Sequence, residues 1–196
     1  MHKKIFLFLS LFAALAGVSF AQDNLSQKPV AIRVGFGGDF LREDSRPRIV
    51  QVKASAVKSS VFLNTDPVEK TAFNLINQKR ADLGLKPLTW NNELASVARL
   101  HSRNMAEFDF FAHRGIDGKM VSDRADDLGV GKWGSIGENI AFNRGFQDPV
   151  AKAVELWLNS TSHRNNLLDA NWKDSAIGVA ITDDGSYYFT QVFLRK

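Results

Sequence analysis

Segments with helical periodicity come before segments with strand character in the part of the chain that begins at Asp66. Asp183-Asp184-Gly185 lies between the last two apolar runs and is a strong hairpin signal. Helices followed by a hairpin favour an α+β fold, because a parallel α/β sheet requires strands and helices to alternate. The predicted helices cover residues 66–83, 92–108 and 148–164, and the predicted strands cover residues 176–181 and 187–194.

Capping signals mark where these helices begin and end. Asp66 and Asp148 are each followed by proline, the arrangement of an N-cap residue before the first helical position. Gly84 is a natural stop for the first helix. Each helix carries an apolar face, which indicates a buried side. The expected buried positions are Ala72, Phe73, Ile76 and Leu83 in the first helix, Leu94, Ala98, His101, Met105 and Phe108 in the second, and Val150, Ala153, Val154, Trp157 and Leu158 in the third.

The chain contains no cysteine, so disulfides cannot stabilise it even in a compartment that would permit them. Its fold must therefore be held by an apolar core. Hydrophobic residues make up 44% of the chain, with 15 Phe and 4 Trp, and this is enough to supply one.

The first 21 residues have the pattern of a secretory signal peptide. A basic start precedes an apolar run over residues 5–18, and Ser19 and Ala21 provide small residues for cleavage after Ala21. The run is shorter than the roughly 20 residues that span a bilayer, which favours cleavage over a membrane anchor. We therefore predict export to the periplasm or the cell exterior. Residues 22–63 are expected to form an extension or a linker.

Without this signal peptide the chain is nearly neutral. In the remaining chain 23 Lys and Arg residues face 21 Asp and Glu residues, a net charge of +2. Such a balance gives no reason to expect nucleic acid or an anionic membrane as a partner. No later segment is long and apolar enough to span a bilayer. The expected partners are a small ligand, a lipid or an extracellular protein.

Three histidines and one glutamate have distinctive sequence neighbours. His101 lies on the apolar face of the second helix, His113 follows that helix, and His163 lies near the end of the third. Glu138 lies between Gly137 and Asn139, at the start of an apolar run. Two imidazoles and a carboxylate can bind zinc or another divalent cation and leave one coordination position open. The same groups could act as proton donors and acceptors. His113, Glu138 and His163 are therefore the candidate metal ligands.

Structural roles would explain the same residues. In this alternative His101 is a core histidine with a satisfied hydrogen bond. Glu138 is a carboxylate that caps a turn, and His163 is a helix-end residue whose charge complements the helix dipole. The sequence separations between His113, Glu138 and His163 are long, so nothing local forces the three side chains together.

Four motifs occur in order between residues 66 and 194. They are Phe110-Phe111-Ala112-His113, Gly137-Glu138-Asn139-Ile140, the stretch from Trp157 to Leu168, and the closing pair Ile177–Ala180 and Tyr187–Phe193. Together they resemble the bacterial branch of the CAP superfamily, the cysteine-rich secretory, antigen 5 and pathogenesis-related-1 proteins with an SCP-type domain. Ala112 stands where that pattern commonly has serine, a mild departure.

The resemblance implies a three-layer α-β-α sandwich over residues 64–196. It also implies a cleft, because eukaryotic members often have two His and two Glu that bind zinc. His113 and Glu138 match the first His and the first Glu of that set. Ser160 and Tyr188 stand where the second Glu and the second His would fall, so both count as cleft-lining candidates.

Half of the eukaryotic tetrad is therefore absent, and His163 is the expected replacement, with His101 as a further residue of the cleft. We predict a secreted binding module whose cleft takes a divalent cation or a small ligand without turnover. A metal-dependent hydrolase of peptides or cell-envelope material is an alternative, in which Glu138 acts as metal ligand or general base. A purely structural or interaction protein is the third possibility. No cofactor other than the cation is expected.

Overall fold

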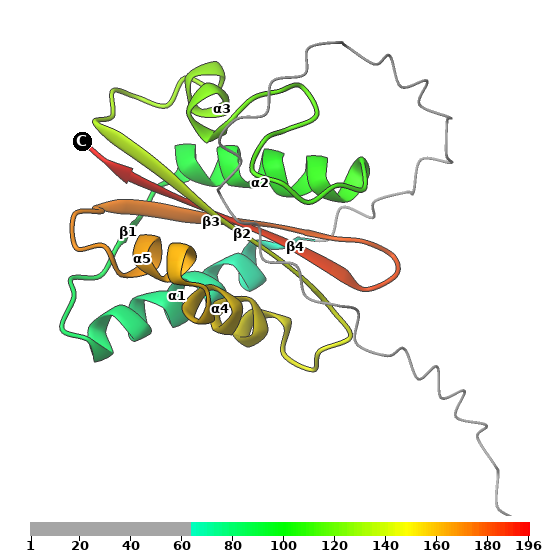
Figure 1. Cartoon of the computed structure of the whole chain (residues 1–196), viewed down its shortest axis with the longest axis horizontal. Coiled ribbons are helices and arrows are strands. Elements are labelled where there is room, and N and C mark those ends of the chain that lie inside the picture. Colours follow the sequence, from blue (N-terminus) through cyan, green and yellow to red (C-terminus); the bar gives the residue numbers. More distant parts are fainter. Residues whose placement is uncertain (1–63) are drawn as a thin grey trace, which may run out of the picture.

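The computed structural model describes residues 64–196, which form five helices and four strands (Figure 1). The predicted signal peptide, residues 1–21, and the predicted extension, residues 22–63, lie outside the described residues. The helices are α1 (Asp66–Asp82), α2 (Asn92–Glu107), α3 (Val121–Asp127), α4 (Pro149–Asn159) and α5 (Thr161–Leu168). The strands are β1 (Thr89–Trp90), β2 (Ser135–Arg144), β3 (Asp174–Ile181) and β4 (Ser186–Arg195).

The strands form one mixed sheet in the order β1-β3-β4-β2. β3 and β4 form the predicted hairpin, in which Ile181 pairs with Tyr187 and Gly185 takes a φ of 74° in the turn. β2 pairs antiparallel with the other side of β4, and the two residues of β1 pair parallel with β3. β2 therefore forms one edge of the sheet. The polar residues of the candidate site lie beside this edge.

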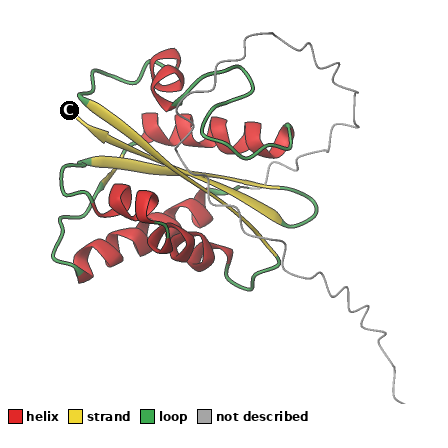
Figure 2. Cartoon of the chain, viewed as in Figure 1, coloured by secondary structure: helices red, strands yellow, loops and turns green. Residues whose placement is uncertain are grey.

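Helices cover both faces of this sheet (Figures 1 and 2). α2 and α3 lie on one face, and α1, α4 and α5 lie on the other. Consecutive residues of β3 and β4 are buried, where a sheet with one wet face would show alternation. The predicted α+β fold with a three-layer α-β-α sandwich is confirmed.

Apolar cores on both faces hold the layers together. Burying one large apolar side chain contributes roughly 1.5–3 kcal/mol, so these cores take the place of the missing disulfides. The core beneath α1, α4 and α5 includes Phe73, Ile76, Trp157, Leu167, Ile177, Val179, Phe189 and Phe193. The core beneath α2 and α3 includes Leu94, Val97, Ala98, Ala125, Ala176 and Val192. A smaller cluster beneath α2 includes Met105 and Ile140.

The absence of a side chain at Gly178 sets how closely α2 approaches the sheet. A Cβ atom on Gly178 of β3 would overlap backbone atoms of Ala98 and Arg99 in α2. Ser102 uses the same close approach, because its hydroxyl donates to the Gly178 carbonyl at 2.9 Å and contacts the Thr190 hydroxyl at 2.8 Å. Direct helix-to-backbone contact therefore fixes α2 on the sheet.

Glu69 of α1 links the two helical layers around the β3 side of the sheet. Its buried carboxylate accepts from Nε of Arg99 in α2 at 3.0 and 2.9 Å. It also accepts the backbone N–H of Val179 at 3.2 Å. β1 pairs with β3 only at Asp174 and Ser175, so Glu69 satisfies a strand N–H that β1 does not reach.

Some helix ends differ from the predictions. The N-cap of α1 is Thr65, and Asp66 lies in the first turn. Leu83 and Phe108 were expected on buried faces but are 60% and 51% exposed. Both follow the last helical residue, where helical periodicity no longer sets the direction of a side chain. Leu158 is half-buried, although it was expected to be buried.

α4 begins as predicted, since the Asp148 carboxylate caps it by accepting from the N–H of Ala151 at 2.8 Å. β1 was not among the predicted strands. β2 was not predicted as a strand, because Gly137 interrupts its apolar pattern. Among the described residues, no helix has the length and apolar character needed to cross a membrane.

Gly178→Ala is expected to lower the free energy of unfolding by about 3 kcal/mol, because the added methyl group would push α2 away from the sheet. Gly131→Ala is the matched control, since a Cβ atom there meets nothing within 4 Å, and its expected effect is below about 0.5 kcal/mol. Urea unfolding of both variants gives the comparison. Equal effects would contradict the role assigned to Gly178.

Glu69→Ala is expected to lower the free energy of unfolding by about 3 kcal/mol, because it removes one partner of an ion pair. This value is at the low end of the range for buried ion pairs, since the Arg99 side chain is 36% exposed. Glu155→Ala removes an exposed partner of Lys152 and is expected to cost less than about 0.5 kcal/mol. Both values come from urea unfolding. A loss for Glu69→Ala as small as that for Glu155→Ala would contradict the link between the layers.

Candidate functional site

Successive side chains of β2 point to opposite faces of the sheet and so reach both helical layers. Glu138 points to the layer of α2, where it lies 3.9 Å from His101. Asn139 points to the opposite layer and donates to the backbone carbonyl of His163 in α5 at 2.9 Å. Gly137 leaves room for the Trp172 ring, since a Cβ atom there would lie 2.9 Å from it. The Gly-Glu-Asn motif thus connects both layers at the sheet edge.

Glu138 is the centre of a buried polar cluster. Its side chain is 3% exposed. One carboxylate oxygen, Oε1, accepts from Nδ1 of His113 at 2.8 Å. The other oxygen, Oε2, accepts from Nη2 of Arg124 at 2.6 Å. Both oxygens of this carboxylate are therefore engaged within the chain.

The surroundings of Glu138 keep it ionised. Burial is the largest influence and by itself would raise the pKa of this carboxyl group. The hydrogen bond from His113 and the charges of His101, Arg124 and His113 outweigh it, so the pKa lies below its ordinary value. Glu138 is thus a buried carboxylate with compensating partners, and the interpretation as a turn cap is wrong because it lies within β2.

Arg124 of α3 holds the loop that carries His113. Its Nη1 donates to the backbone carbonyls of His113 at 3.2 Å and Lys119 at 2.7 Å, while Nη2 binds Glu138. Arg124 was not among the site residues predicted from the sequence. The signal in the sequence was a charged residue one position before Ala125 in the segment of α3. In the structure Arg124 is buried, with 3% of its surface exposed.

His101 is a buried core histidine, as the structural alternative predicted, and it also borders the cluster. It is 0% exposed, and its Nε2 donates to the backbone carbonyl of Ala112 at 3.0 Å. Its Nδ1 has no hydrogen-bond partner within residues 64–196. Burial is the largest cause of a lowered pKa for this imidazole, with Glu138 opposing and Arg124 adding to that effect.

His163 lies in the first turn of α5, whose N-cap is Ser160. The interpretation as a C-terminal helix residue that complements the dipole is therefore wrong, because a helix N-terminus disfavours positive charge. The Ser160 hydroxyl lies 2.7 Å from Nδ1 of His163, within hydrogen-bond distance. Burial, followed by the nearby charge of His113, lowers the pKa of His163 to about 4.

The structure brings most of the candidate residues together. The rings of His113 and His163 are stacked with centroids 6.1 Å apart and planes at 19°. Tyr188 is the exception, because it pairs with Phe142 and packs in an aromatic group. It lies four residues from Val192, the strand partner of Glu138, which is roughly 13 Å along a strand.

The donor atoms left over determine what the cluster can bind. Nδ1 of His113 is engaged by Glu138 and Nδ1 of His163 by Ser160, so each ring keeps its Nε2 for a ligand. No group of three or more His, Cys, Asp or Glu side chains within residues 64–196 is arranged to hold a metal ion.

A profile of the cysteine-rich secretory protein family, CAP, matches residues 73–193, more than half of the chain. The chain belongs to the CAP family. Within this CAP domain, His113, Glu138 and His163 all fall inside the matched region.

This CAP domain is similar to three bacterial proteins. The uncharacterized membrane protein YlbC of Bacillus subtilis is 38% identical over 128 residues, which make up 65% of this chain and 34% of YlbC. The structure of an extracellular SCP-domain protein of Bacillus anthracis matches with a TM-score of 0.57 and 34% identity, over 67% of this chain and 41% of that one. An outer surface protein of Borrelia burgdorferi matches with a TM-score of 0.61 and 22% identity, over 68% of this chain and 96% of that one. The last likeness concerns the fold alone. The chain spans only about a third of YlbC.

His163→Gln is expected to weaken the acid sensitivity of the CAP domain. The pKa of His163 is about 4 in the folded protein and 6.5, the ordinary value, in the unfolded chain. Between these two pH values the unfolded chain therefore binds a proton at His163 that the folded protein does not. Stability is therefore lost as the pH falls from about 6.5 to about 4. Between pH 7 and pH 5 the native protein should lose about 2 kcal/mol more than the variant. Urea unfolding at both pH values measures this difference, and no difference is expected between pH 7 and pH 8. Equal losses between pH 7 and pH 5 would contradict the burial of a neutral His163.

Proposed function

We propose that this CAP-domain protein is exported and acts as a binding module whose ligand contacts the paired imidazoles of His113 and His163. Zinc is the first ligand to test, because neutral imidazole nitrogen is a preferred ligand of that cation. The observation that carries the proposal is the stacked pair of rings, each with Nδ1 held inside the chain and Nε2 left over. Two protein ligands would leave coordination positions for water or for groups of a second molecule.

In this proposal Glu138 orients His113 and is not itself a ligand. A carboxylate that accepts from the far nitrogen of a metal-binding histidine fixes its tautomer and its direction. The geometry at His113 and Glu138 has this form. The guanidinium of Arg124 at 2.6 Å would also repel a divalent cation placed on the same carboxylate. In place of the trio expected from the sequence, we propose two imidazole ligands, with Glu138 and Arg124 as their supports.

Binding without turnover is favoured over hydrolysis by the state of Glu138. An efficient general base has a pKa near the working pH, because a weaker base gives little driving force for proton transfer. The pKa of Glu138 lies below its ordinary value, and both of its oxygens are engaged. A hydrolase would need a different base.

Export is supported by sequence and by relatives. The signal-peptide pattern of residues 1–21 predicts it. The matching Bacillus anthracis protein is described as extracellular and the Borrelia protein as an outer surface protein. YlbC is described as a membrane protein, so attachment to the membrane is the alternative. Fractionation of the producing cells distinguishes a released protein from one that stays with the membrane.

Calorimetric titration of the metal-free protein with zinc tests the proposal. We expect about one equivalent to bind, and His113→Ala to abolish binding because one of the two ligands is lost. Glu138→Gln should retain the fold and weaken binding by about 10-fold to 100-fold, since it removes the charge that orients His113. Arg114→Ala is the matched control next to His113, and it should bind zinc as the native protein does.

Two outcomes would contradict this proposal. Zinc binding that survives in both His113→Ala and His163→Ala would place the metal elsewhere. Absence of zinc binding in the native protein would reject the cation site. If His113→Ala then changed only the free energy of unfolding, the purely structural alternative would account for the cluster.

A further inference from the structure

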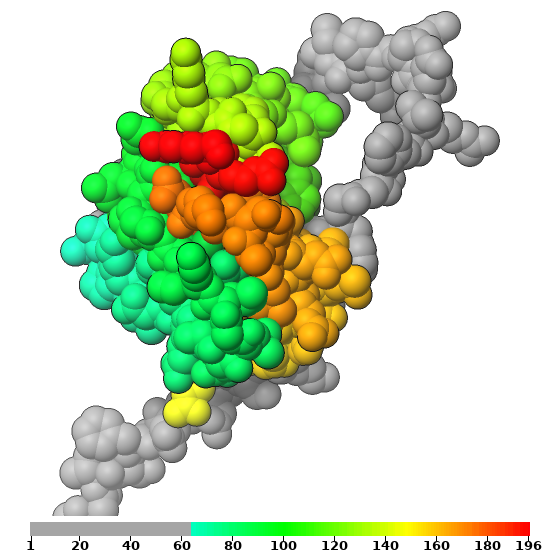
Figure 3. All heavy atoms as spheres, turned by 90° about the vertical axis from the view of Figure 1, so that its left-hand side faces the viewer, coloured from blue at the N-terminus to red at the C-terminus, as the bar shows by residue number. Residues whose placement is uncertain are grey.

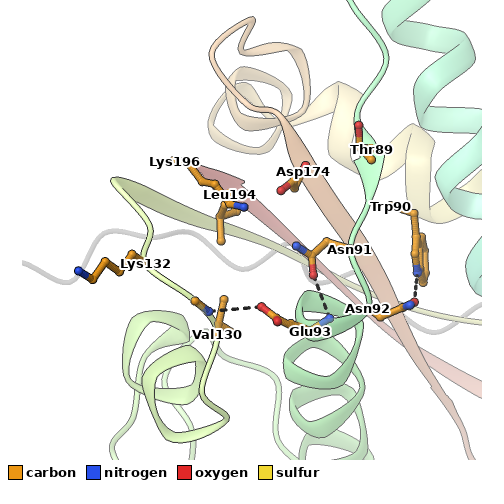
Figure 4. Close-up of a pocket in the computed structure, with 11 residues that line it drawn as sticks. Thr89, Trp90, Asn91, Asn92, Glu93, Val130, Lys132, Asp174, Leu194 and Lys196 are labelled. Atoms are coloured by element: carbon orange, nitrogen blue, oxygen red, sulfur yellow. Dashed lines mark hydrogen bonds between the residues drawn. The ribbon is translucent and has the colours of Figure 1, made fainter.

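A second cleft, separate from the polar cluster, lies at the end of the sheet near β1 and the C-terminal end of β4. Its volume is about 700 Å³, and we call it the end cleft (Figure 4). It is built by segments far apart in the sequence: the β1–α2 junction, the loop between α3 and β2, the start of β3 and the end of β4. Figure 3 faces this end of the molecule, where the red, orange, green and yellow-green segments adjoin. No residue that lines it belongs to the cluster around Glu138.

The end cleft has an apolar base. Leu194 and Val130 line it and are 2% and 9% exposed, so they belong to the core beneath α2 and α3. An apolar base of this kind with a few polar groups around it is typical of sites for small organic ligands. The polar groups therefore decide which ligand is suitable.

The wall of the end cleft offers one unpaired acceptor and one unpaired donor. Asp174 points its carboxylate toward the cleft (Figure 4), and no ion pair within residues 64–196 uses it. Asn91 lies beside it, and its Oδ1 caps α2 by accepting from the N–H groups of Glu93 and Leu94 at 2.9 and 3.2 Å. The amide NH₂ of Asn91 is thus the part that remains for a ligand.

The other charges are placed differently. The carboxylate of Glu93 accepts the N–H of Gly131 at 3.3 Å and so joins α2 to the opposite loop. Lys132 and Lys196 line the rim, and in Figure 4 the Lys132 side chain extends outward. Neither lysine forms an ion pair in the described part of the chain. A lysine on its flexible stem can follow an anion at the rim.

A matching ligand carries a cation for Asp174, a carbonyl for the Asn91 amide and an anion for Lys132. A peptide with free ends has all three, joined by a backbone and side chains that suit an apolar base. Clefts of about 300–1,000 Å³ hold ligands up to drug size, so the end cleft has room for several residues. We infer that the end cleft is a second ligand site of this protein, for a short zwitterionic peptide. This site goes beyond the proposed function and does not depend on it.

Nuclear magnetic resonance titration with trialanine tests this inference on protein expressed from the full chain. Trialanine is expected to shift the backbone amides of the residues that line the end cleft and the indole N–H of Trp90, which is bonded to Asn92 at 2.9 Å. N-acetyl-trialanine and trialanine amide, which each lack one terminal charge, should bind about fivefold more weakly.

Two variants assign the ends of the peptide. Asp174→Asn should weaken trialanine about fivefold but leave N-acetyl-trialanine unchanged, whereas Lys132→Gln should weaken trialanine but leave the amide unchanged. Asp183→Asn, in the turn between β3 and β4, is the matched control and should have no effect. His113→Ala should also leave peptide binding unchanged.

The inference is overturned if no residue of the end cleft shifts at the solubility limit of trialanine. It is also overturned if the three peptides bind equally well, or if Asp174→Asn affects trialanine and N-acetyl-trialanine alike. Spectra of each variant without peptide show whether its fold is retained. Failure here leaves the zinc titration unaffected, because that test depends on other residues.

Discussion

The direct contact between α2 and the sheet at Gly178 is the constraint on which the rest of this structure depends. Because Gly178 has no side chain, the backbone of α2 lies against the backbone of β3. Ser102 then bonds to the strand carbonyl, and its neighbour His101 is carried to within 3.9 Å of Glu138. A helix held further out would leave Glu138 with fewer compensating partners, and burial of a carboxylate without partners is very costly. The polar cluster is therefore a consequence of how closely the layers pack.

The position of β2 at the edge of the sheet explains why one site can draw on both helical layers. His113 belongs to the loop after α2, and His163 belongs to α5 on the opposite face. Only around an edge strand can rings from the two layers stack, here at 6.1 Å. Alternation along β2 supports both of them, since Glu138 holds His113 and Asn139 holds the backbone of His163.

The two candidate sites differ in their physical character. The cluster around Glu138 is buried, and its carboxylate is paired inside the chain with Arg124 and bonded to His113. The end cleft is open, and the carboxylate of Asp174 forms no ion pair in the described residues. The cluster leaves imidazole nitrogen for a ligand, whereas the end cleft leaves a carboxylate without an ionic partner. We therefore propose a cation for the first and a zwitterion for the second.

Local interactions were predictable from the sequence alone. The Asp148 cap, the stop at Gly84 and the β3–β4 hairpin each depend on residues within a few positions of one another. The lack of cysteine required an apolar core, and the motif order identified the family. The same motifs supplied His113, Glu138 and His163, because family patterns retain residues whose contacts are distant along the chain.

Tertiary packing alone decided how those residues are used. Arg124 binds Glu138 from another element, and no local pattern pairs the two. His163 was expected near a helix C-terminus, but the chain bends at Ser160 and begins a new helix, which reverses the sign of the nearby dipole. Tyr188 was matched to the cleft by its place in a motif, but strand register sets it beside Phe142. Periodicity and caps are set within a few residues, whereas register and layer spacing are set by the whole core.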